Sequence, residues 1–241
     1  MIAYLFVLAV GLIAGAISGV IGTGSSIILL PILVFTFGPK QAIPIMAVAA
    51  VMANLARVMA WWKLIDWRAF AAYSISGIPA AAIGARTLLA LPVNLINSFL
   101  GLFFILMIPL RHWLIARNFR LSLWHLSLAG GVIGFLTGVV LSTGPLSVPA
   151  FTAYGLVKGA FIATEAASSL FLYVGKLIVF GEFGALPPNI FIKGLLVGAS
   201  LMAGTFAGKI VMLKLSERTF QHLLDCLLFC SGMSLLWAAV A

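Results

Sequence analysis

The stretch AGAISGVIGTGSSIILLPIL, residues 14–33, decides the fold class of this chain. It is apolar up to a break rich in Gly, Ser and Thr at 22–26, after which a second apolar run begins. The run before the break, 2–21, has the length of about 20 residues that a helix needs to cross a bilayer. The run after it, 25–37, makes only roughly 20 Å of helix against a hydrocarbon core of about 30 Å. The stretch therefore predicts a transmembrane helix followed by a short one.

The composition extends this prediction to the whole chain. Of the 241 residues, 63% are hydrophobic and 8% are charged, whereas a soluble domain carries about 25% charged residues. Apolar runs predict ten helices, at residues 2–21, 25–37, 41–62, 67–89, 93–110, 122–141, 145–157, 159–181, 189–213 and 218–240. We expect an all-α polytopic membrane protein in a bacterial-type inner membrane, with the lipid bilayer as its surroundings.

The net charge of +9 would suggest a nucleic-acid partner in a soluble protein. Here the loops are too short to hold such a surface, and the bias of Lys and Arg toward cytoplasmic loops explains much of the excess. The sequence therefore predicts no nucleic-acid binding.

The second half of the chain repeats the first. A row of three glycines recurs 119 positions later, and at nearly the same shift a Thr-Gly step and a cation recur. The matched residues are Gly11, Gly15 and Gly19 with Gly130, Gly134 and Gly138, Thr23-Gly24 with Thr143-Gly144, and Arg57 with Lys176. We expect transmembrane repeats at 1–110 and 122–241, joined by a basic cytoplasmic connection at 111–121. Short, Gly- or Pro-interrupted segments at matching places in two repeats indicate the binding site of a secondary transporter.

Two arrangements of the repeats are open. If 25–37 and 145–157 cross the membrane fully, each repeat has five crossings and the second repeat is inverted. If they are re-entrant, each repeat has four crossings and the repeats are parallel. The inverted arrangement places eight loop cations in the cytoplasm and two, Lys40 and Lys193, outside, against six and four for the parallel one. The positive-inside rule favours inverted 5+5 repeats with both termini outside.

Both short segments start like helices that could bind an anion. Ser and Thr are preferred at helix N-caps, and a helix N-terminus offers unpaired N–H groups and a partial positive charge. The candidate substrate-binding residues here are Thr23, Gly24, Ser25 and Ser26 in the first copy and Ser142, Thr143 and Gly144 in the second. The alternative is a capped turn at the membrane surface.

Four polar side chains within the predicted helices complete the candidate site. Arg57 and Lys176 are intramembrane cations, which are costly in lipid and so indicate a protein, water or substrate partner. Snorkelling to the headgroups is the alternative. Asn54 shares a helix face with Arg57. Glu165 is the carboxylate well inside a predicted span, and we interpret it as a coupling residue, with a proton as the coupling ion, or as a helix-end charge. Lys176 lies about 16 Å along the helix from Glu165, too far for direct pairing.

Several motifs are absent from the sequence. It has no phosphate-binding loop, no paired-histidine zinc motif and no nucleophile elbow. We therefore expect no enzyme activity, no cofactor and no metal site. The two glycine rows are small-residue stripes that predict close helix packing, between the halves or between protomers of a homo-oligomer.

The stretch at 14–33, continued by NLARV at 54–58, and a weaker copy, GGVIGFLTGVVLSTGPLSVPAF at 130–151, resemble the TauE/SafE family of membrane permeases, often called sulfite exporters. The resemblance covers essentially the whole chain. It implies export or uptake of a small organosulfur anion such as sulfite or sulfoacetate, coupled to an ion gradient.

Residues and resemblance together predict a secondary active transporter, an exporter of such an anion, that works by alternating access between its repeats. Arg57 would supply charge, and the two Thr-Gly turns would bind oxygen atoms. One alternative is a channel-like anion pore with the same site and no coupling. The other is an accessory membrane subunit that transports nothing.

Overall fold

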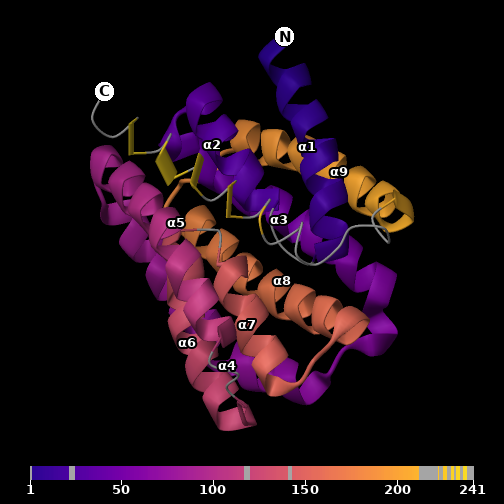
Figure 1. Ribbon diagram of the computed structural model, residues 1–241. Helices are drawn as coiled ribbons and strands as arrows, with labels where there is room; N and C mark the ends of the chain where they lie inside the picture. Colours follow the sequence, from indigo (N-terminus) through magenta and orange to yellow (C-terminus); the bar gives the residue numbers. More distant parts are fainter. Residues whose placement is uncertain are drawn as a thin grey trace.

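The computed structural model describes residues 2–21, 25–116, 120–140, 143–211 and several residues between 222 and 237 (Figure 1). The described part is helical, with no strand. Its helices are α1 (Ile2–Ile21), α2 (Ser25–Phe37), α3 (Pro39–Trp61), the short 3₁₀ helix η1 (Trp62–Leu64), α4 (Trp67–Ala90), α5 (Val93–Ala116), α6 (Leu123–Val140), α7 (Gly144–Tyr154), α8 (Lys158–Glu182) and α9 (Pro188–Val211). The predicted helix at 218–240 lies mostly outside the described residues, and those described between 222 and 237 are helical.

The chain is a multi-pass membrane protein. Four helices of the described part are long and apolar enough to cross a bilayer, and they include Lys40–Leu64, Leu123–Val140, Gly159–Glu182 and Pro188–Ala207. The short second helix of each half, α2 with 13 residues and α7 with 11, is confirmed.

Local chemistry explains where helices begin and end. α4 begins after Asp66, whose carboxylate accepts hydrogen bonds from the backbone N–H groups of Arg68 and Ala69, each at 3.0 Å. α7 ends at Gly155, whose φ of 110° suits a residue without a side chain. One helix boundary differs from the prediction. α5 continues past residue 110, its predicted end, to Ala116, and Pro109 lies inside the helix without ending it. Part of the basic connection at 111–121 is therefore helical.

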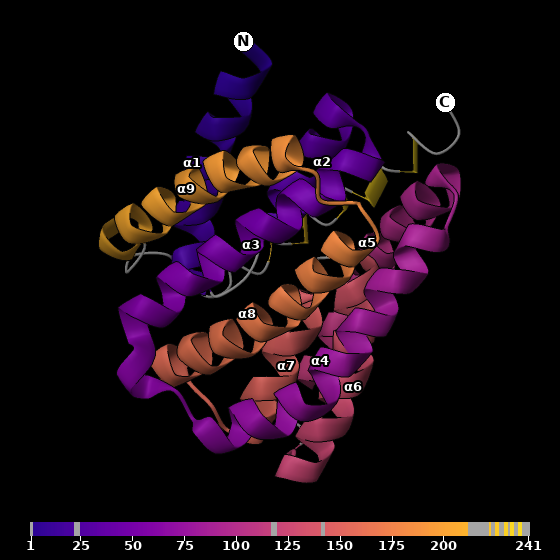
Figure 2. The same ribbon diagram turned by 180° about the vertical axis from the view of Figure 1, so that it is seen from behind.

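The helices of the two halves pack in matching pairs. The largest helix contacts in the described part are α4 with α6 and α1 with α9, followed by α3 with α9, α3 with α8 and α4 with α8. The first helix of each half therefore packs on the fourth helix of the other half. Figures 1 and 2 show these pairs side by side from opposite directions, with α3 and α8 in the middle of the molecule.

The glycine rows form the two largest of these contacts. A Cβ atom added at Gly15 would lie 2.3 Å from the backbone oxygen of Leu201 in α9, and one added at Gly134 would lie 2.4 Å from that of Gly77 in α4. Only glycine lets these backbones approach so closely. The predicted close packing is therefore confirmed as packing between the two halves.

The directions of the central helices follow from which residues meet. α3 and α8 run antiparallel, since Arg57 meets Glu165 and, further along α3, Trp61 meets Gly159 nearer the start of α8. α3 and α9 run parallel, since Gly194 meets Val48 and Gly198 meets Met52.

The C-terminal residues give a second antiparallel pair. Gly232 meets Ile105 and Gly101 of α5, and His112, further along α5, lies 2.8 Å from the carboxylate of Asp225. The C-terminal segment therefore runs antiparallel to α5. The fifth helix of the first half packs in the opposite direction to the described residues at the end of the second.

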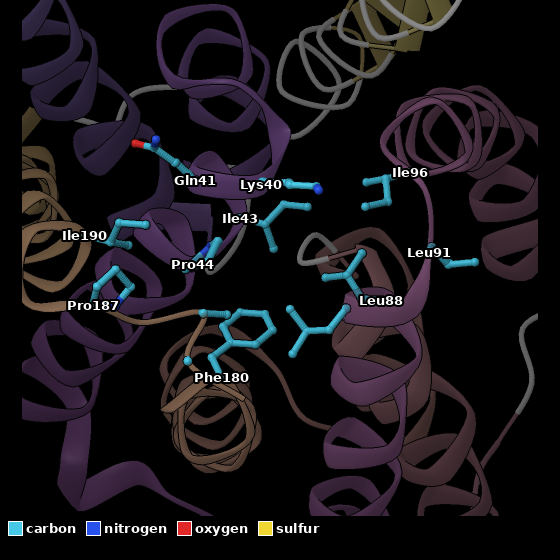
Figure 3. Close-up of a pocket in the computed structure, with 13 residues that line it drawn as sticks. Lys40, Gln41, Ile43, Pro44, Leu88, Leu91, Ile96, Phe180, Pro187 and Ile190 are labelled. Atoms are coloured by element: carbon cyan, nitrogen blue, oxygen red, sulfur yellow. The ribbon is translucent and has the colours of Figure 1, made fainter. Parts of the chain in front are cut away.

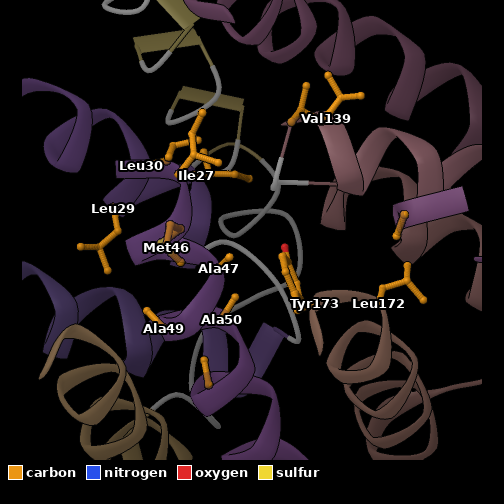
Figure 4. Packing of buried hydrophobic residues seen from close by; sticks show 14 of the residues in the cluster. Ile27, Leu29, Leu30, Met46, Ala47, Ala49, Ala50, Val139, Leu172 and Tyr173 are labelled. Carbon is orange, nitrogen blue, oxygen red and sulfur yellow. The ribbon is translucent and has the colours of Figure 1, made fainter. Parts of the chain in front are cut away.

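The apolar core concentrates around α3. Ala47, Ala49 and Ala50 are fully or almost fully buried, as are Ile27 and Leu30 of α2, which packs on α3. Figure 4 shows this packing, with Tyr173 of α8 beside it.

Candidate functional site

Arg57 and Glu165 form an ion pair across the interface between the halves. The Nη1 atom of Arg57 on α3 lies 3.4 Å from Oε2 of Glu165 on α8. Both side chains are buried, with 6% and 4% of their surface exposed. The distance exceeds the about 2.7–2.9 Å that is usual for a charge-assisted hydrogen bond, so the carboxylate holds the guanidinium loosely.

The guanidinium has one further partner and one open donor. Its Nη2 donates to Oδ1 of Asn54 at 2.5 Å, and Asn54 in turn donates to the Ala50 carbonyl oxygen at 2.8 Å. The Nε of Arg57 is buried and has no hydrogen-bond partner among the described residues. An unpaired buried donor is costly, so this N–H group is available to an acceptor that enters the site.

Two hydroxyl groups complete the surroundings of the carboxylate. Ser147, in the first turns of α7, donates to Oε1 of Glu165 at 3.2 Å, and Ser169 of α8 donates to the same atom at 2.8 Å. One helical turn beyond Ser169, Tyr173 shares a hydrogen bond with Ser26 of α2. Each short helix therefore contributes a hydroxyl group, Ser26 from α2 and Ser147 from α7, to a cluster of polar side chains that otherwise belong to α3 and α8.

The sequence pointed to four members of this cluster, Asn54, Arg57, Glu165 and Ser26, which the structure brings to one interface. It missed the hydroxyl groups of Ser147 and Ser169. The spacing of four residues from Glu165 on one helix could have indicated Ser169. Nothing in the sequence indicates Ser147, because it reaches Glu165 only through the packing of α7 on α8.

Lys176 lies apart from this cluster and is fully buried. Its Nζ donates to the carbonyl oxygen of Thr137 at 3.1 Å and to that of Gly138, both near the end of α6. The ammonium also lies 5.3 Å from the centre of the Phe180 ring. No acidic side chain of the described residues pairs with it. Helix carbonyls and an aromatic face stabilise the cation, since both present partial negative charge.

The second Thr-Gly turn adjoins this lysine. The hydroxyl of Thr143, the N-cap residue of α7, lies 2.5 Å from the hydroxyl of Thr137. Lys176 and Thr143 thus meet through one residue, Thr137, that the sequence did not single out. Thr143 makes no side-chain hydrogen bond to its own helix start.

The remaining predicted residues are placed as follows. Ser25 and Ser26 begin α2 and are buried, and Gly144 begins α7 half-buried. Thr23, Gly24 and Ser142 lie outside the described residues. The described residues hold no group of three His, Cys, Asp or Glu side chains arranged to bind a metal ion.

The chemistry of this arrangement suits an oxyanion. It has two buried cations, six hydroxyl groups and two helix N-termini, and the carboxylate of Glu165 already fills the position of an anion on Arg57. A family model described as "Sulfite exporter TauE/SafE" matches residues 7–235 of the chain. No curated protein and no solved structure matches it.

Proposed function

The chain belongs to the sulfite exporter TauE/SafE family of membrane transporters, and on that premise we propose that it is a secondary active exporter of a small organosulfur anion such as sulfite or sulfoacetate. The observation that carries the proposal is the Arg57–Glu165 pair, because it joins a cation for the anion to a carboxylate that can carry a proton. The family indicates a transported anion and a membrane permease rather than an enzyme.

We propose that the repeats are inverted, with five helices each. A two-fold axis that exchanges the halves maps α3 onto α8, so this pair runs antiparallel only if the axis lies in the membrane plane. The antiparallel contact of Gly159 with Trp61 supports that direction, as does the contact of Gly232 with Gly101. Parallel 4+4 repeats with re-entrant segments would require both pairs to run parallel.

In the proposed mechanism the anion and a proton bind together. Without substrate, the carboxylate of Glu165 pairs with the guanidinium of Arg57. A proton on Glu165 removes its charge and frees Arg57, whose fork of N–H groups matches an oxyanion. The unpartnered Nε of Arg57 then gains an acceptor, and Asn54 holds the guanidinium in place. Because the proton and the anion bind together, they cross the membrane in the same direction, and export is driven by the outward gradient of the accumulated anion, which carries the proton with it.

The two rival functions differ from this proposal in their fluxes. A channel-like anion pore would conduct without counterflow and would ignore the proton gradient. An accessory subunit would show no flux, and changes at Arg57 would alter only assembly. We also propose an inner-membrane location and a homo-oligomer, but neither property distinguishes a carrier from a pore or an accessory subunit.

The test is counterflow in liposomes. Purified protein is reconstituted with trapped sulfite or sulfoacetate, and uptake of labelled anion is measured for the wild type beside Arg57→Ala. Counterflow that is lost in the folded variant supports a carrier with Arg57 in its site. Fast leak without counterflow supports the pore, and absence of flux for every small sulfur anion tested rejects the proposed substrate class.

A further inference from the structure

We propose that the cavity at one end of the helix bundle is the entry and exit path for the anion, and that Phe180 is the gate between this path and Lys176. The inference rests on the proposed function and adds to it a vestibule, its charge selectivity and a gating residue. It is carried by the shape of the cavity, the placement of charge around it and the packing of the opposite end.

The cavity has a volume of about 320 Å³ and lies where five helix ends meet. It is lined by residues at the start of α3, the end of α4, the start of α5, the end of α8 and the segment leading into α9. Figure 3 shows Leu88 and Phe180 facing one another on one side of the space, and Lys40 extending across it toward Ile96. This volume is within the range of about 300–1,000 Å³ typical of small-molecule sites.

One side chain that lines the cavity, Lys40, carries a positive charge. The amine of Lys193, which does not line the cavity, lies 3.2 Å from the side-chain oxygen of the lining residue Gln41. None of the described residues that line the cavity is acidic. A cleft with one sign of charge and low-dielectric walls concentrates ions of the opposite sign. The cavity is therefore suited to admit anions and to exclude cations.

The wall of the cavity leads directly to the second buried cation. The Phe180 side chain lines the cavity, and the centre of its ring lies 5.3 Å from the Nζ atom of Lys176. Lys176 itself has no exposed surface and is not a lining residue. Phe180 thus contacts both the cavity and the cation that adjoins Thr137. Phe180 therefore occupies the position of a gate.

At their opposite ends, α3 and α8 pack closely on one another. There Gly159 of α8 fits against Trp61 and Leu64, and the backbone N–H of Asp66 donates to the hydroxyl of Thr164 at 2.9 Å. The cavity thus lies at one end of the central pair α3 and α8, and the described residues at the other end of the pair pack closely. In the proposed inverted topology, the end with Lys40 faces outside and the closely packed end faces the cytoplasm.

Cysteine labelling tests the vestibule. Cys226 and Cys230 are exposed free thiols, so both are first replaced by Ser. A cysteine is then placed on α4 at Leu88, which lines the cavity, or at Ala69, near the opposite end of the same helix; the two positions are matched, with 2% and 0% exposure. Each is treated in intact cells with a membrane-impermeant methanethiosulfonate reagent carrying either a sulfonate or a trimethylammonium group.

We expect Leu88→Cys to react at least about tenfold faster than Ala69→Cys, and to react faster with the sulfonate reagent than with the ammonium reagent. Adding Lys40→Gln should remove most of this preference, because it removes the cation at the mouth. Equal rates at both positions, reaction of Leu88→Cys only in inside-out vesicles, or a preference for the ammonium reagent would overturn the vestibule.

The gate is tested by Phe180→Ala beside Phe180→Leu, which keeps most of the volume. We expect the Ala variant to leak trapped sulfite several-fold faster than wild type and the Leu variant to leak much less. Unchanged leak in a folded Phe180→Ala protein would overturn the gate. Labelling needs no transport, so wild-type liposomes without sulfite flux reject the proposed function separately from the vestibule.

Discussion

Arg57 and Lys176 occupy matching places in the two halves, 119 positions apart, and both are buried cations on the two central helices. Their partners differ. Arg57 has a carboxylate at 3.4 Å and an open Nε, whereas Lys176 is bound by two backbone carbonyl oxygens of α6 and an aromatic ring. The two halves thus hold buried cations at corresponding positions with different electrostatics.

This difference in partners indicates that the two cations have different roles in the proposed transport. At Arg57 an anion must displace Glu165, so binding is linked to the charge of that carboxylate. At Lys176 the competing groups are neutral carbonyls, so an anion can bind without a proton. We expect Arg57 to couple transport to the gradient and Lys176 to attract the anion from the cavity. The following predictions test that division, from the largest effect to the smallest.

The largest effect is expected for Arg57→Ala. This change leaves Glu165 buried without a cation, which costs about 3–5 kcal/mol of stability, and removes the anion's main partner, so counterflow should fall below detection. Thermal unfolding in detergent and counterflow in liposomes measure the two effects.

The matched control is the double variant Arg57→Met with Glu165→Leu. Replacing a buried ion pair by apolar side chains is often neutral or stabilising, so we expect stability to return while counterflow stays absent. Counterflow by the double variant would show that the pair has only a structural role.

A smaller effect is expected for Lys176→Met. No opposite charge is left behind, so the stability loss should be less than that of Arg57→Ala. One charge-assisted hydrogen bond contributes about 1.5–3 kcal/mol, which predicts a loss of about 10–100-fold in anion affinity, measured from the concentration dependence of counterflow. A stability loss equal to that of Arg57→Ala would remove the contrast between the two cations.

Glu165→Gln should separate exchange from coupling. The amide oxygen still accepts a hydrogen bond from Arg57, so counterflow should persist, but accumulation driven by a proton gradient should disappear. In wild type, acidification protonates Glu165 and frees Arg57, so flux should rise as pH falls, and the Gln variant should lose this dependence. An alkanesulfonate is the suitable substrate, because its charge stays constant over the pH range. Gradient-driven accumulation by the variant would assign coupling elsewhere.

The smallest effect concerns the support of Lys176. Gly134→Ala would place a Cβ 2.4 Å from the Gly77 carbonyl oxygen, and such overpacking costs about 1–3 kcal/mol. Because it pushes α6 from α4, it should also weaken the carbonyl contacts of Lys176 and lower flux modestly. Gly131→Ala on the same helix is the control: its nearest neighbour would be 3.7 Å away, so we expect unchanged or slightly higher stability. Equal destabilisation by both variants would contradict this account.

Much of the fold could be predicted from the sequence. Apolar runs and breakers predicted most described helix boundaries to within two or three residues, including the short α2 and α7. The glycine rows predicted close packing, and the motif at 14–33 indicated the family that the match over 7–235 now establishes. These features are local, because hydrophobic periodicity, caps and turn residues act within a few residues of the chain.

The site could be predicted only in part. A charge within an apolar helix is conspicuous, so Arg57, Lys176 and Glu165 were recognisable as candidates. Their partners were not, because Ser147, Thr137 and Phe180 are ordinary residues for such helices and become important only through packing.

The sequence by itself determined that this chain is a membrane-embedded helical transporter of the TauE/SafE family, with a duplicated pattern and few buried charges. Only the tertiary structure decided that Glu165 meets Arg57 across 108 positions of sequence, that Lys176 meets the end of α6, and that a cavity lies beside Phe180 at one end of the central helices. The physical reason is range. Burial in a helix follows from neighbouring residues, whereas the partner of a buried charge depends on which helices pack together and in which direction.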